Sequence, residues 1–87
     1  MKQVIRINGE LIPGLYELEL KPSSRVARIR FQEQPSNNGY LQVDFQSGGV
    51  YRYLNVPRSV AENLEKAESV GKAMNDIIKN YEYLKLC

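Results

Sequence analysis

The strongest constraint on the fold is an alternation of apolar and polar side chains between residues 25 and 54. Apolar side chains occupy every second position in two stretches: Ala27, Ile29, Phe31, Leu41, Val43 and Phe45. Successive side chains of a β-strand point to opposite faces, so this period predicts two strands that are each buried on one face. A polar turn at residues 34–39 separates them, and a Ser-Gly-Gly turn at 47–49 leads into a third strand, residues 50–54. We therefore expect an antiparallel meander.

The N-terminal segment adds a β-hairpin. Asn8-Gly9 lies between two apolar runs, and the type I′ turn of a short hairpin needs positive φ at both central positions. Pro13-Gly14 predicts a break, after which residues 15–20 alternate as a separate strand. The hairpin carries further apolar side chains: Val4, Ile5, Ile7, Leu11 and Ile12. A chain of 87 residues buries only about 60–65% of its unfolded surface, so we expect a homodimer or a larger homo-oligomer.

Two amphipathic helices are predicted after the meander. Pro57 suits the first position of the first helix, and Ser69 is a suitable N-cap for the second. Apolar residues recur at helical spacing in both: Val60, Ala61, Leu64, Ala67, Ala73, Met74, Ile77, Ile78 and Tyr81. Residues 81–86 fit a frayed helix end and a strand equally well. The predicted fold class is α+β, with an N-terminal β-hairpin and an antiparallel β-meander followed by two amphipathic helices.

The same patterns assign the two faces of the sheet. We expect these side chains to be largely buried: Ala27, Ile29, Phe31, Leu41, Val43, Phe45, Leu64, Met74, Ile77 and Ile78. If the meander pairs in simple order, the other face carries Arg28, Arg30, Gln42, Asp44 and Arg52 as neighbours. Three guanidinium groups beside one carboxylate can bind phosphates. Alternatively they are ordinary surface charges, in which Asp44 pairs with Arg28 or Arg52.

Composition limits the chemistry of the chain. Histidine is absent and Cys87 is the only cysteine, which removes the usual general base and the commonest transition-metal ligand. The carboxylates show no recognisable catalytic spacing, so we expect no enzyme activity, no metal and no cofactor. No apolar run approaches the roughly 20 residues that span a bilayer, and no apolar signal core opens the chain. We therefore expect a cytoplasmic protein without membrane contact, in the host cytoplasm if a phage encodes it.

An ordered set of residues resembles the KTSC domain family. The set is Ser23, Ser24, Tyr51, Arg52, Tyr53, Val56, Pro57, Ala67, Ser69, Gly71, Lys72, Asn75, Ile78 and Tyr81. The resemblance covers about residues 23–86 of an expected single domain, residues 1–87, and leaves residues 1–22 as an N-terminal addition. It implies a small β-meander followed by two helices. Family members often carry aromatic residues where this chain has Ala61 and Met74.

The start of the second helix is a candidate anion site. Free amides at a helix N-terminus carry partial positive charge, Gly71 permits close approach to the backbone, and Lys72 adds a full charge. Asn75 and Lys79 lie on the same side of the helix as Lys72, at spacings of three or four residues. The alternative is an ordinary Ser69 cap after a tight turn between the helices.

Tyr51 and Tyr53 precede and follow Arg52 in the third strand of the meander. Tyrosines beside a basic residue can stack on nucleotide bases. The alternative is that both are core residues whose hydroxyls reach the rim. The helix start, the arginine face and the tyrosines all favour a ligand with phosphate and aromatic parts, which is the composition of a nucleotide.

Net charge favours a compact nucleotide over a long polymer. The chain has 12 basic and 10 acidic residues, whereas proteins that track a nucleic-acid backbone concentrate more positive charge. We therefore expect non-catalytic binding of a small phosphate-bearing nucleotide, such as a cyclic oligonucleotide signal of the kind that phage sponge proteins sequester. RNA binding is the alternative, which the KTSC resemblance implies because members occur at the C-terminus of some lysyl-tRNA synthetases. A protein-interaction module that uses the hairpin or a sheet edge is a second alternative.

Overall fold

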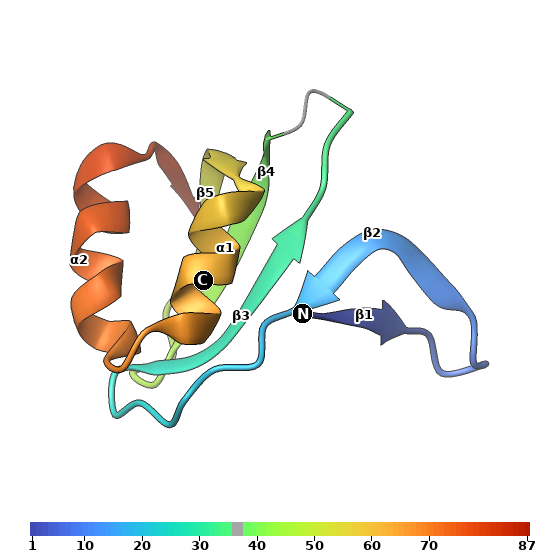
Figure 1. Cartoon of the computed structure of the whole chain (residues 1–87), viewed down its shortest axis with the longest axis horizontal. Coiled ribbons are helices and arrows are strands. Elements are labelled where there is room, and N and C mark those ends of the chain that lie inside the picture. Colours follow the sequence, from blue (N-terminus) through green and yellow to red (C-terminus); the bar gives the residue numbers. More distant parts are fainter. Residues whose placement is uncertain (36–37) are drawn as a thin grey trace.

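The computed structural model describes residues 1–35 and 38–87, and within these ranges the chain forms a six-stranded antiparallel sheet and two helices (Figure 1). The elements are β1 (Lys2–Ile5), β2 (Leu11–Glu17), β3 (Val26–Gln32), β4 (Asn38–Phe45), β5 (Val50–Pro57), α1 (Arg58–Lys66), α2 (Val70–Asn80) and β6 (Tyr83–Lys85). The strands follow one another across the sheet in sequence order. The predicted α+β class is therefore confirmed, and the C-terminal segment forms an edge strand that pairs with β5.

One face of the sheet packs against the helices and the other face is open. Ile29 and Phe31 are fully buried, whereas Arg28 and Arg30 beside them in β3 are not, so the strand separates an apolar face from a polar one. The apolar face and the inner sides of α1 and α2 form a common core: Leu18, Val26, Ile29, Phe31, Leu41, Val43, Tyr53, Val56, Ala61, Leu64, Val70, Met74 and Ile77. Arg28 and Arg30 therefore lie on the side of the sheet away from the helices.

A bulge at the start of β3 changes which residues enter the core. Val26 is buried, whereas Ala27, which was predicted to be buried, is exposed. The pairing register with β4 shifts between Val26 and Arg28, so the alternation changes phase at this point. Phe45 lies opposite Val26 at the end of β4 and is only partly buried. The burial prediction was wrong for Ala27 and too strong for Phe45.

The helices differ from the prediction at single positions. Those α2 residues that are buried follow the spacing i, i+4, i+7: Val70, Met74 and Ile77. Ile78 is 37% exposed, so its predicted burial is wrong, because it lies one position beyond this stripe. Pro57 was predicted to be the first residue of α1. It is instead the last residue of β5, and α1 begins at the next residue, Arg58. Neither helix in the described ranges is long and apolar enough to cross a membrane.

The N-terminal hairpin forms, with Gly9 at a φ of 86° in its turn. The predicted type I′ turn is wrong, because the φ of Asn8 is not positive and the Gly9 N–H instead donates to the Arg6 oxygen. Pro13 and Gly14 do not break the hairpin, because β2 runs through both residues to Glu17, and the predicted separate strand at residues 15–20 is wrong. The pairing register with β1 shifts along this segment, which accommodates the missing N–H of Pro13 and the φ of 71° at Gly14. β2 curves strongly, so the hairpin projects from the rest of the molecule (Figure 1).

The turn predicted at residues 34–39 falls between β3 and β4, and its residues Ser36 and Asn37 lie outside the described residues. β4 already begins at Asn38, so Gly39 is a strand residue rather than a turn residue. Only glycine fits at this position, because a Cβ atom would overlap the backbone oxygen of Gln32 on β3. Gly39 therefore allows β3 and β4 to approach closely at this end of the sheet.

Candidate functional site

The open face of the sheet brings together the polar residues that the sequence placed there. In the strand register, Arg28 lies opposite Asp44, Arg30 lies opposite Gln42, and Gln42 lies opposite Arg52. The strand alternation that buries the apolar rows thus gathers three arginines on β3 and β5, around the central strand β4.

Carboxylates pair with two of these arginines. Arg28 binds Asp44 through Nε and Nη2, which lie 3.2 and 2.9 Å from Oδ2. The Nε of Arg30 lies 3.4 Å from Oε1 of Glu17 on β2. Exposed ion pairs of this kind stabilise a fold by only about 0–1 kcal/mol, so a stronger anion can compete for either arginine.

Arg52 differs from these arginines, because it forms no ion pair with any residue that the structure describes. Its Nη2 donates to Oε1 of Gln42 at 3.3 Å. The guanidinium carbon lies 5.5 Å from the centre of the Tyr40 ring, which is within the range of a cation–π contact. The positive charge of Arg52 is therefore available to a ligand, beside an aromatic surface.

These side chains border a hollow on the open face. Its volume is about 330 Å³, and its lining residues are Leu15, Arg30, Gln32, Tyr40, Gln42 and Arg52. This volume lies at the lower end of the range for small-molecule sites, about 300–1,000 Å³. The lining includes two arginines, two side-chain amides, an aromatic ring and an aliphatic side chain. These groups together can bind a ligand that contains both an anion and a flat polar ring.

Tyr40 and Gln32 are site residues that the sequence analysis missed. A signal for both was present in the strand pattern. Tyr40 precedes the buried Leu41 and Gln32 follows the buried Phe31, so alternation places both on the arginine face. Tyr51 and Tyr53 adjoin Arg52 in the sequence but lie on the opposite face of β5, whereas Tyr40 shares the face of Arg52.

The start of α2 forms a different group. Oγ of Ser69 accepts from the Lys72 backbone N–H at 3.3 Å, as expected of an N-cap. Arg25, which the sequence analysis also missed, donates from Nη1 to the backbone oxygen of Gly71 at 3.1 Å and to Oδ1 of Asn75 at 2.9 Å. These hydrogen bonds connect the segment before β3 to α2, so Asn75 and Gly71 have a structural partner.

The helix group and the arginine face lie on opposite sides of the sheet. Lys72 and Lys79 are exposed on α2, which packs on the buried face, whereas Arg52 lies on the open face. The sheet and its core therefore separate Lys72 from Arg52 within one chain. A ligand that contacted both groups would need a second subunit.

The tyrosines also belong to the helix-covered side. Tyr53 is only 3% exposed and lies in the core. Burial raises the pKa of its hydroxyl above 10.0, with smaller increases from the neighbouring Tyr51 and Tyr83 and an opposing effect of Arg25. Tyr51 is partly buried, and its ring packs edge-on against Phe45 and Tyr83, with 5.5 Å between centroids in each pair. Both tyrosines therefore face away from the open-face hollow.

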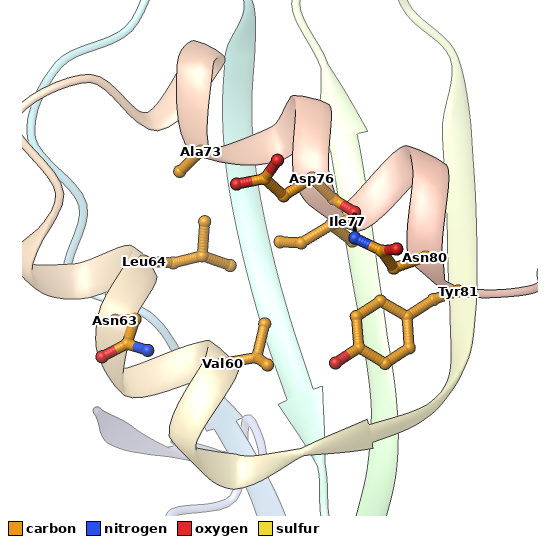
Figure 2. Close-up of a pocket in the computed structure, with 8 residues that line it drawn as sticks. All are labelled: Val60, Asn63, Leu64, Ala73, Asp76, Ile77, Asn80 and Tyr81. Atoms are coloured by element: carbon orange, nitrogen blue, oxygen red, sulfur yellow. Dashed lines mark hydrogen bonds between the residues drawn. The ribbon is translucent and has the colours of Figure 1, made fainter.

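A second hollow lies between the helices (Figure 2). Its volume is about 320 Å³, and its lining residues are Val60, Asn63, Leu64, Ala73, Asp76, Ile77, Asn80 and Tyr81. Apolar side chains from both helices face one another across it, and Asn63, Asp76 and Asn80 supply the polar groups (Figure 2). We call this hollow the interhelical groove. This groove was not predictable from the sequence, because helical spacing shows an apolar stripe on each helix but not the distance between the two helices.

Curated relatives match part of this chain. It is 42% identical over 60 residues to a lysine–tRNA ligase of Nostoc punctiforme, an alignment that covers 69% of this chain and 10% of the ligase. It is also 42% identical over 43 residues to an uncharacterised protein of Stutzerimonas stutzeri, over 49% of this chain and 61% of that protein. The alignments thus span a tenth of the ligase and about three fifths of the second relative.

A solved structure shares the fold. The crystal structure of a KTSC domain protein from Yersinia pestis matches with a TM-score of 0.67 and 28% sequence identity, over 84% of this chain and 99% of that chain. The family model described as the KTSC domain matches residues 22–83, which begin after the hairpin of β1 and β2. The chain therefore belongs to the KTSC domain family.

Proposed function

We propose that this chain is a non-catalytic binding protein for a small nucleotide, which occupies the hollow on the open face. The observation that supports this most directly is Arg52, whose guanidinium has no carboxylate partner within residues 1–35 and 38–87 and lies over the ring of Tyr40. A cation beside an aromatic surface matches the phosphate and the base of a nucleotide.

Each lining group has a role in this proposal. Arg52 binds a phosphate oxygen, and Arg30 joins it by exchanging its 3.4 Å contact with Glu17 for the ligand. Tyr40 provides a flat surface for the base. The amides of Gln32 and Gln42 can donate to and accept from the edge of the base.

Local charge supports a ligand with few phosphates. Glu17 and Asp44 offset Arg30 and Arg28, so the unpaired charge at the hollow comes from Arg52. A protein that follows a polymer backbone neutralises many phosphates, which this face does not offer. A cyclic oligonucleotide signal is a ligand with few phosphates. A protein that binds such a signal without converting it would act as a phage sponge protein.

RNA binding is the second candidate. The observation in its favour is the 42% identity to part of a lysine–tRNA ligase, an enzyme that acts on an RNA. The open face would then hold one nucleotide of a single strand in the same hollow, and Arg28 would contact the neighbouring phosphate.

Isothermal titration calorimetry tests the proposal and separates the two candidates. The purified chain is titrated with mononucleotides, dinucleotides and cyclic oligonucleotides, and with a single-stranded RNA, at several salt concentrations. A small ligand in the hollow gives saturable binding with a weak salt dependence, whereas an RNA gives an affinity that falls steeply with salt. The absence of heat with every nucleotide, together with no RNA binding at low salt, would overturn both candidates.

A further inference from the structure

The N-terminal hairpin carries apolar side chains that this chain does not bury. At its tip, Ile7 is fully exposed at 109%, and Ile5 and Leu11 are 60% and 53% exposed. Hydrogen bonds from the Arg6 N–H to the Glu10 oxygen and from the Gly9 N–H to the Arg6 oxygen order the turn between them. An ordered hairpin that presents apolar side chains to water is typical of an element that docks against another surface.

The interhelical groove is the complementary surface. Its walls are Val60 and Leu64 from α1 and Ala73 and Ile77 from α2, and it opens outward between the helices (Figure 2). Leu64 and Ile77 are buried in the core, so this part of the groove is held in place before any ligand enters. A branched aliphatic side chain fits such an apolar hollow.

Charges at the two surfaces are also complementary. Arg6 precedes Ile7 at the hairpin tip, and its contact with Glu10 is long, 3.7 Å, and exposed. Asp76 lies at the groove, and its carboxylate forms no ion pair among the residues that the structure covers. Arg6 would therefore meet an unneutralised carboxylate when Ile7 enters the groove.

The hairpin of one copy cannot reach its own groove. Figure 1 shows β1 and β2 at one end of the long axis of the molecule and α2 at the other end. We propose that the hairpin tip docks into the interhelical groove of a second copy, with Ile7 in the groove and Arg6 against Asp76. Two copies that exchange hairpins reciprocally bury both sets of apolar side chains and close as a two-fold dimer. This contact does not involve the open-face hollow and is independent of the proposed function.

Sedimentation of single variants tests the contact. The wild-type chain should sediment above its monomer mass of 10.0 kDa at micromolar concentration. Ile7→Asp and Val60→Asp should each raise the dissociation constant of the dimer by at least about tenfold. Leu84→Asp, at an exposed apolar position of β6, is the control and should leave the dimer intact. Circular dichroism verifies that each variant is folded, and a monomeric wild type would overturn the proposal.

Mixing variants distinguishes hairpin-to-groove docking from hairpin-to-hairpin packing. The Ile7→Asp chain keeps its groove and the Val60→Asp chain keeps its hairpin, so an equimolar mixture should form a heterodimer through one intact contact. Packing of hairpin against hairpin would instead leave Val60→Asp dimeric by itself, which would contradict the proposal.

Arg6 and Asp76 are both exposed, so charge reversal at these positions should disturb the fold little. Arg6→Glu and Asp76→Arg should each weaken the dimer, and the double variant should regain affinity because the pair is restored with opposite polarity. Equal dissociation constants for all three variants and the wild type would contradict the Arg6–Asp76 contact.

Discussion

Arg25 and Arg52 lie on opposite sides of the same sheet, and their guanidinium groups have different partners. Arg25 donates to the Gly71 oxygen and to Asn75, so its charge holds α2 to the start of β3. Arg52 donates to the side-chain oxygen of Gln42 and lies beside the ring of Tyr40, and it forms no ion pair among the described residues. The comparison teaches that the presence of an arginine near a polar site does not by itself mark a binding residue. The partners that the fold supplies decide whether the charge is available.

Substitutions on the two faces of β3 should differ most in their effect on the free energy of unfolding. Phe31→Ala removes a fully buried ring and should lower the free energy of unfolding by about 3–5 kcal/mol. Arg30→Ala, one residue away on the open face, should change it by less than about 0.5–1 kcal/mol. Urea denaturation of both variants measures the difference. Similar losses for Phe31 and Arg30 would show that the open face is packed rather than free.

Substitution of Arg25 and of Arg52 should change the free energy of unfolding by different but smaller amounts. Arg25→Ala removes two hydrogen bonds to α2 and should lower the free energy of unfolding by about 1–2 kcal/mol, whereas Arg52→Ala should change it by less than about 0.5 kcal/mol. Asn75→Ala removes one of the same hydrogen bonds, so its effect should not add fully to that of Arg25→Ala. Additive losses would argue against the Arg25–Asn75 interaction.

The smallest effect concerns the hydroxyl of Tyr53 on the buried face. Its pKa in the folded state is raised above 10.0 by burial, so the fold favours the neutral hydroxyl. This contribution is complete below the unfolded pKa and is lost as pH rises through the folded pKa, so the wild type should lose stability above about pH 10. Tyr53→Phe should lose less stability above about pH 10 than the wild type, because it has no hydroxyl to ionise at this position. Denaturation curves at about pH 8 and about pH 11 test it, and an unchanged slope in Tyr53→Phe would contradict it.

The regular parts of the fold were predictable because side-chain period depends on local geometry. Alternation identified the strands, and the Asn8-Gly9 pair identified the hairpin. The prediction failed where pairing register overrides local pattern. The bulge beside Val26 exposes Ala27, and the irregular pairing of β1 with β2 carries the strand through Pro13.

The candidate site was predictable only in part. Arg30 and Arg52 were found because alternation assigns a face to each residue. Tyr40 on the same face was not predicted, because it lies on the neighbouring strand and only the pairing of β4 with β5 brings it beside Arg52. The helix group of Lys72 could not be placed relative to Arg52, because the side of the sheet on which a helix packs depends on tertiary contacts.

The affinity of Arg52→Ala for a nucleotide tests the central claim most directly. The ligand is the nucleotide that binds the wild type best in the calorimetric panel, and Lys66→Ala is the matched control, because it removes one exposed positive charge far from the hollow. Arg52→Ala should weaken binding by about 1–3 kcal/mol, which corresponds to roughly 5- to 150-fold in Kd, and Lys66→Ala should leave Kd unchanged. Equal Kd values for the wild type and Arg52→Ala, or equal losses in Arg52→Ala and Lys66→Ala, would contradict a nucleotide site on the open face.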